Sequence, residues 1–170
     1  MRNLSPQQQK QITPQAPNLT EIQTIAQEQN ATLVQYSLVA NNLLYIWVIP
    51  PDGEIKFRSV NLPEDISLAK LVQFSREQIG VRNRSGDNPT LPITNSTNHL
   101  QQLHQLLIAP IAELLPEKEE ELIIFIPHQE LFLVPFAALQ DEKQTYLIEK
   151  HTILTAPSIQ SLSFTRQHHQ

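Results

Sequence analysis

Cysteine is absent from this chain of 170 residues. Without a thiol, the chain can form no disulfide, no thiolate zinc site and no cysteine nucleophile of its own. Glycine is also scarce: Gly53, Gly80 and Gly86 are the only three, and neither a Gly-rich phosphate loop nor a Gly-x-Ser-x-Gly elbow is present. The sequence therefore argues against nucleotide-binding and serine-hydrolase functions.

Basic residues and long apolar runs are few as well. The chain has 12 Lys and Arg against 17 Asp and Glu, for a net charge of -5. A general nucleic-acid binder needs clustered basic side chains to neutralise phosphates, and the few basic residues here are scattered. No run approaches the roughly 18 apolar residues of a membrane span, and the start, MRNLSPQQQKQ, lacks the apolar core of a signal peptide. We therefore expect a cytoplasmic protein with neither nucleic acid nor membrane as a partner.

The composition predicts one domain with loose ends. A hydrophobic content of 40% is ordinary for a globular protein of this length. Residues 1–20 are rich in Gln and Pro and are predicted to be a disordered tail, as are residues 167–170. A short helix is expected over Leu19–Gln29, and the division of the chain into segments places it at residues 21–30. The domain itself is expected over residues 31–166, with a mobile loop at 83–98.

The first half of the domain predicts three strands. Val34, Tyr36 and Leu38 alternate with polar residues, and a strong β run follows over Leu43–Ile49. The turn formers at residues 50–53, PPDG, then lead into a third alternating segment, Glu54–Val60. This pattern is typical of a three-stranded antiparallel meander.

Two amphipathic helices are predicted next. Apolar residues at helical spacing indicate a helix over Glu64–Val81, begun by Pro63 and an acidic first turn and ending near Gly80. A second stripe runs from Leu100 to Leu114, with Pro110 forcing a kink or a fresh start. Both helices need an apolar surface to cover.

A buried strand supplies that surface. Leu122–Ile126 is an unbroken apolar run closed by Pro127, which suits a strand buried on both faces. Leu131–Phe136 is expected to pack back on the core, and Tyr146–Thr155 to be a second strand. Ser158 is a plausible N-cap for a last helix, Ile159–Arg166. Helices alternating with apolar strands predict an α/β class with a mostly parallel sheet.

Few side chains suggest chemistry. His128-Gln129-Glu130 follows the buried strand, where α/β sheets often place sites, but the Pro-Cys-x-x-Cys partner of a His-x-Glu zinc motif is missing, so a surface turn is the better interpretation. The other histidines are equally unpromising: His99 and His104 are not at metal-ligand spacing, His151 is expected on a solvated strand face, and His168 and His169 lie in a polar tail. Tyr45 and Trp47 are interpreted as packing residues. No catalytic, cofactor-binding or metal-binding residue is predicted.

Several stretches resemble one known family. IIFIPHQELFLVPFAAL at residues 123–139 and YLIEKHTILTAPSIQSL at 146–162 are similar to the first third of a CHAT domain, the caspase-like peptidase domain often linked to tetratricopeptide repeats. Upstream, residues 32–60 and REQIGVRNR at 76–84 resemble the lead-in of the same family, so the likeness spans roughly Thr32 to Leu162. The resemblance implies a caspase-like fold and cysteine peptidase chemistry. The family's His, in a motif like HxATHG, and its Cys, in one like SAC, lie downstream of the matching segment and have no counterpart here.

We therefore expect the amino-terminal portion of such a domain, inactive alone and acting as a scaffold or interaction fragment. Half of a split cysteine peptidase completed by a second polypeptide, and a decayed gene product, stay open as alternatives. The expected partner supplies the missing CHAT segment or tetratricopeptide repeats. An open apolar sheet edge should also make the isolated chain self-associate, be poorly soluble or be partly molten.

Overall fold

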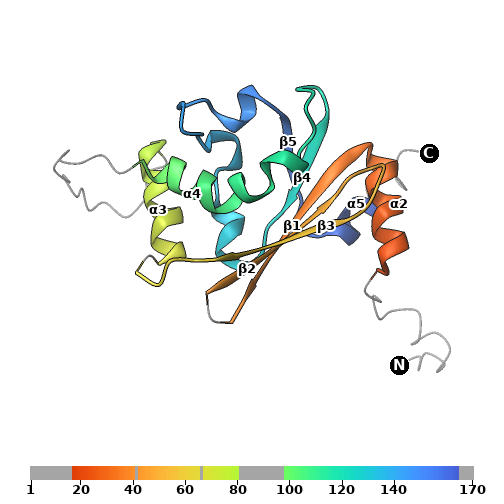
Figure 1. Cartoon of the computed structure of the whole chain (residues 1–170), viewed down its shortest axis with the longest axis horizontal. Helices are drawn as coiled ribbons and strands as arrows, with labels where there is room; N and C mark the ends of the chain where they lie inside the picture. The colour runs from red at the N-terminus through yellow and green to blue at the C-terminus, as the bar shows by residue number, and fades with distance from the viewer. Residues whose placement is uncertain (1–16, 41, 66, 81–97, 165–170) are drawn as a thin grey trace, which may run out of the picture.

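The computed structural model describes residues 17–40, 42–65, 67–80 and 98–164 (Figure 1). Most of the predicted tails and loop, at 1–20, 83–98 and 167–170, falls outside these residues. The elements follow in the order α2 Leu19–Gln29, β1 Ala31–Val39, β2 Leu43–Ile49, β3 Lys56–Asn61, α3 Leu68–Gln78, α4 His99–Leu107, η1 Ala109–Leu114, β4 Leu122–Ile126, η2 Gln129–Leu133, η3 Phe136–Ala138, η4 Leu147–Glu149, β5 Thr152–Thr155 and α5 Ile159–Phe164. The η elements are short 3-10 helices. None of the helices in the described ranges is long and apolar enough to cross a membrane.

One five-stranded sheet, in the order β3-β2-β1-β4-β5, forms the centre of the molecule. The pairs β1/β2 and β2/β3 are antiparallel, as the predicted meander requires. The pairs β1/β4 and β4/β5 are parallel. The α/β class is confirmed, and the meander and the parallel strands share one mixed sheet through β1.

Helices cover both faces of this sheet. Figure 1 shows α3 and α4 on one side, and α2 with α5 on the other. Successive side chains of a strand point to opposite faces. Accordingly Ile123 and Phe125 of β4 join the core under α3 and α4, whereas Ile124 and Ile126 join the core under α2 and α5. The prediction that β4 is buried on both faces is therefore confirmed.

Aromatic residues organise the larger core. Phe125 and Phe136 stack with ring centroids 4.4 Å apart, and Tyr36 lies 6.3 Å and 5.7 Å from them. The Tyr36 hydroxyl donates a hydrogen bond of 2.9 Å to the Leu107 carbonyl at the end of α4. Burial raises the pKa of Tyr36 well above its ordinary value. The phenol thus stays neutral and joins β1 to α4.

Local hydrogen bonds set the helix boundaries. Asn18 and Glu21 form a reciprocal capping box at the start of α2, and Asn30 ends the helix in the left-handed region. The predicted helix bounds Leu19–Gln29 are confirmed, whereas Leu19 and Thr20 belong to α2 and not to the predicted tail. The prediction that α3 begins at Glu64 was wrong: Ser67 accepts the Lys70 N–H at 3.5 Å, and the helix begins at Leu68. Pro110 does end α4 and opens η1, as expected.

The prediction that one strand spans Tyr146–Thr155 was also wrong, because the observed strand is shorter. The Glu149 carboxylate accepts the Tyr146 N–H at 2.9 Å and turns the chain into η4, so β5 begins only at Thr152. The preceding segment packs on the core as expected, but as η2 and η3, with Leu131 and Phe136 buried. Ser158 caps α5 by accepting the Ser161 N–H at 3.1 Å, which confirms the predicted cap.

Candidate functional site

A groove lies where the parallel strands end. β4 is followed by Pro127 and His128, and β5 by Pro157 and Ser158; these residues and Gln35 of β1 line a hollow of about 480 Å³. The carboxyl ends of parallel strands are where α/β sheets usually place their sites. This position, and the polar groups at it, make the groove the first place to look for chemistry.

His128 in this groove has a structural partner. Its Nδ1 accepts a hydrogen bond of 3.0 Å from the Leu38 N–H, beyond the last paired residues of β1 and β4. Gln129 then adopts a positive φ of 53° and starts η2, which carries Glu130 to the surface. The imidazole therefore fastens the end of β4 to β1, and the pair His128 and Glu130 forms no joint site.

The remaining histidines do not converge. Within the described residues, no group of three or more His, Asp or Glu side chains could hold a metal ion. His99 packs its ring on Phe74, with centroids 5.3 Å apart. Burial lowers the pKa of His104, while nearby Asp141 acts in the opposite direction. His168 and His169 lie outside the described residues.

His151 differs from its prediction. It precedes β5 rather than lying on a solvated strand face, and its Nδ1 is buried without a hydrogen-bond partner in the described structure. Burial, and then the charge of Lys150, lower its pKa. The buried nitrogen therefore belongs to a neutral ring at the entrance to β5.

The aromatic residues of β2 pack on their neighbours. Tyr45 and Trp47 contact each other edge to face at 5.8 Å, and Phe57 of β3 lies 5.1 Å and 5.3 Å from them. This geometry matches the packing role expected of Tyr45 and Trp47.

The two edges of the sheet differ. At one edge, β3 carries Lys56 and Arg58, and Arg58 pairs with Glu113 of η1 at 2.9 Å. At the other edge, β5 has the sequence TILT, with no charge, and Leu154 is 55% exposed. Charged side chains on an edge strand oppose pairing with another chain, and their absence permits it. We call β5 the open edge.

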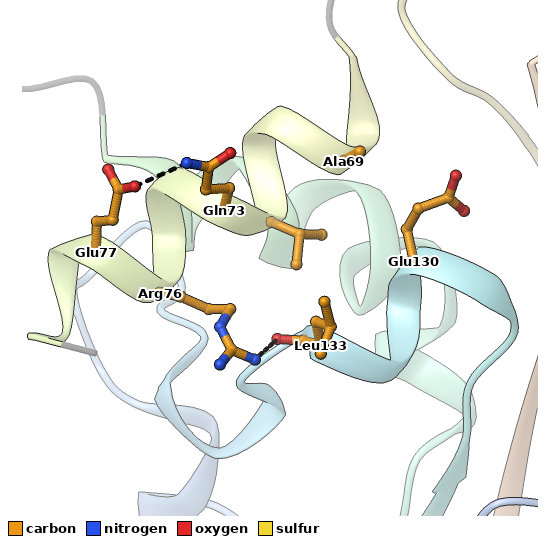
Figure 2. A pocket seen from close by; sticks show the side chains of 7 residues that line it. Ala69, Gln73, Arg76, Glu77, Glu130 and Leu133 are labelled. Atoms are coloured by element: carbon orange, nitrogen blue, oxygen red, sulfur yellow. Dashed lines mark hydrogen bonds between the residues drawn. The ribbon is translucent and has the colours of Figure 1, made fainter. Parts of the chain in front are cut away.

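A second groove runs beside α3 and was not predicted. In Figure 2, Arg76 of α3 reaches toward Leu133 of η2, while Gln73 is turned toward Glu77. These residues, with Ala69 and Glu130, line a hollow of about 310 Å³. An adjoining hollow of about 490 Å³ shares Ala69 and Glu130 with it. We call the two together the α3 groove. Its lining comes from segments up to 95 residues apart, from Leu38 to Leu133, so no local pattern could have indicated it.

Asp141 orders the loop before η4. Lys150 donates to its carboxylate, and so do the backbone N–H groups of Thr145 at 3.0 Å and Lys143 at 2.8 Å. These donors, first among them Lys150, lower the pKa of the Asp141 carboxyl to about 2. The loop hydrogen bonds thus depend on an ionised carboxylate.

We expect Asp141→Asn to destabilise the protein by about 0.5 to 1 kcal/mol near neutral pH, since the surface ion pair with Lys150 is lost. The folded pKa is below the unfolded value of about 4, so the wild-type advantage is present above pH 4 and lost as the pH falls through about 2. Urea unfolding of both proteins at pH 6 and pH 2 measures this difference. A difference that persists at pH 2, or an equal loss in the neighbouring control Glu142→Gln, would contradict the prediction.

One comparison with known proteins finds a match, in the second half of the chain. The family model described as CHAT domain matches residues 97–170. No curated protein and no solved structure matches the chain. The matched segment contains α4, β4, the open edge and part of the lining of the groove at the strand ends, whereas the upstream resemblance at 32–60 and 76–84 lies outside it. Over residues 97–170 the chain therefore resembles a CHAT domain, the family that the sequence was predicted to resemble.

Proposed function

We propose that this chain is the non-catalytic scaffold of a caspase-like peptidase domain, and that it acts by pairing through the open edge with a polypeptide segment that carries a catalytic His and Cys. The observation that carries the proposal is β5. This strand lies at the end of the sheet, within the CHAT match, and combines an exposed Leu154 with a complete lack of charge.

The chemistry of the chain supports a non-catalytic role. Thiol peptidases need a thiolate and an imidazole that activates it, and the sequence has no Cys. His128, the histidine at the strand ends, uses Nδ1 to accept the Leu38 N–H. The hydroxyls of Ser75, Thr152 and Ser161 donate to backbone carbonyls rather than to an imidazole. None of these three hydroxyls is therefore paired with an imidazole that could activate it.

The groove at the carboxyl ends of the strands supports the choice of partner. A strand added next to β5 in parallel would end beside Pro157 and Ser158, at the same edge as the ends of β4 and β5. Side chains that follow such a strand would therefore lie at the mouth of the groove. Main-chain pairing would give the affinity, and the exposed Leu154 an apolar contact.

Reconstitution tests this function. The tagged chain is co-expressed with a CHAT segment containing motifs like HxATHG and SAC, and the complex is isolated through the tag. We expect the two polypeptides in near-equal amounts, and we expect Leu154→Lys to abolish co-purification because it puts a charge on the open edge. The matched control is Phe57→Lys on β3, which should leave pairing unchanged.

Peptidase activity of the complex decides between the two forms of this function. An inactive complex leaves the chain a scaffold, and an active one makes it half of a split cysteine peptidase. Hydrolysis of peptides by the isolated chain, or pairing that survives Leu154→Lys, would refute the proposal.

A further inference from the structure

We propose that the α3 groove binds a basic, apolar-containing peptide segment of a partner protein. This contact would be separate from the open edge and does not depend on the scaffold role. The inference rests on an apolar floor, an excess of unpaired carboxylates around it, and the length of the groove.

The floor of the groove is apolar and partly open to water. Val72 of α3 is buried at its base, and Val39 at the end of β1 and Leu133 of η2 are exposed by 41% and 56%. Leu62 and Leu68 extend the apolar lining. Covering Val39 and Leu133 would remove apolar surface from water, which favours binding.

The rim of the groove is acidic. Glu64, Asp65 and Glu130 line it, and none of the three makes an ion pair or hydrogen bond within the described part of the chain. Glu77 also lines the groove and accepts a hydrogen bond of 3.0 Å from Gln73. A ligand that brings Lys or Arg side chains would therefore pair carboxylates that now face only water.

Arg76 does not neutralise this excess. Figure 2 shows its guanidinium reaching across the groove, where Nη1 donates to the Leu133 carbonyl at 3.4 Å. It is the one basic residue among those that line the α3 groove, against four carboxylates. The net charge of the lining is negative, which disfavours an acidic ligand and speeds the approach of a basic one.

The dimensions suit a short extended peptide. From Ala69 to Glu77 the helix covers about 12 Å at 1.5 Å per residue. An extended chain advances about 3.3 Å per residue, so roughly four residues span this part, and the adjoining hollow takes a few more. Alternate residues of such a chain point to opposite sides, so one set can contact the floor and the other the rim.

Binding of a probe peptide tests the proposal. The probe is a fluorescein-labelled peptide of eight residues in which Lys and Leu alternate, and its affinity for the 170-residue chain is measured by fluorescence anisotropy. We expect the triple variant Glu64→Gln, Asp65→Asn, Glu130→Gln to bind about tenfold more weakly, since it removes several exposed ion pairs. The matched control is Glu117→Gln, Glu119→Gln, Glu120→Gln, which changes the net charge equally at exposed positions outside the groove and should bind within twofold of the wild type.

A second pair of variants tests the floor. Leu133→Ser should weaken binding about fivefold, because the exposed leucine no longer contributes apolar area, whereas Leu154→Ser on β5 should have no effect. If the two triple variants lose affinity for the probe equally, overall charge alone explains the effect, and the proposal is overturned. A wild-type chain that fails to bind the probe, or that binds a Glu-Leu alternating peptide as tightly, would also overturn it.

Discussion

Replacing Phe125 by alanine is expected to lower the free energy of unfolding by about 3 to 5 kcal/mol. Phe125 is fully buried in β4 and stacks on Phe136 with an angle of 9° between the rings. Its contacts with Tyr36 and Phe136 join β4, β1 and η3 in a single cluster. Deleting the ring leaves a cavity at the middle of the sheet that three separate elements would have to fill.

Urea unfolding, followed by circular dichroism, measures this loss. The control is Phe57→Ala on β3, where the ring is 46% exposed and contacts Tyr45 and Trp47. We expect a loss of about 1 kcal/mol there. If Phe125→Ala does not fold, Phe125→Leu keeps part of the volume and should give an intermediate loss. Equal effects at positions 125 and 57 would contradict the central role of the cluster.

Self-association through the open edge is the second expected effect. Among the residues that the structure describes, β5 has no strand neighbour on its outer side, and its Leu154 is exposed; both features favour pairing with another molecule. We expect the isolated wild-type chain to form oligomers whose size increases with concentration. Leu154→Lys should shift it to monomers with little change in stability, because the side chain is already exposed.

Sedimentation over a hundredfold range of concentration measures this shift. Phe57→Lys makes the same kind of change on β3, where Lys56 and Arg58 already discourage pairing, and should leave the oligomers intact. A wild-type chain that sediments as a monomer throughout and melts in one sharp transition would contradict the prediction. Such a result would mean that the helices and strands of this chain form a complete hydrophobic core without a partner.

Local patterns in the sequence predicted the elements whose causes are local. Alternating residues and the PPDG turn were enough for β1, β2 and β3, and the capping residue Ser158 for the start of α5. Two predictions failed where a local side-chain hydrogen bond favours a different structure from the one that the residue pattern indicated. Ser67 rather than the Pro63 region begins α3, and the Glu149 carboxylate turns the chain into η4 where apolar residues indicated a strand.

Pairings and grooves depend on residues far apart, and sequence patterns could not supply them. The position of His128 after β4 was predictable, but its bond to Leu38, 90 residues away, was not. The carboxylates of the α3 groove illustrate the same limit: Asp65 and Glu130 look like ordinary surface residues until the fold brings them around one apolar floor. The absence of cysteine, in contrast, is read directly from the composition.

The shared strand β1 also has a consequence for synthesis. Its pairing with β2 and β3 is complete once residue 61 has emerged from the ribosome, but its other side waits for β4, since Ala31 pairs with Leu122, 91 residues later. At about 5 to 20 residues per second, elongation over the 61 residues from Asn61 to Leu122 takes roughly 3 to 12 s. During this interval the nascent meander exposes Leu33 and Val34, both fully buried in the finished protein, beside an unpaired backbone. This chain should therefore depend on co-translational chaperones more than a meander with a local partner would.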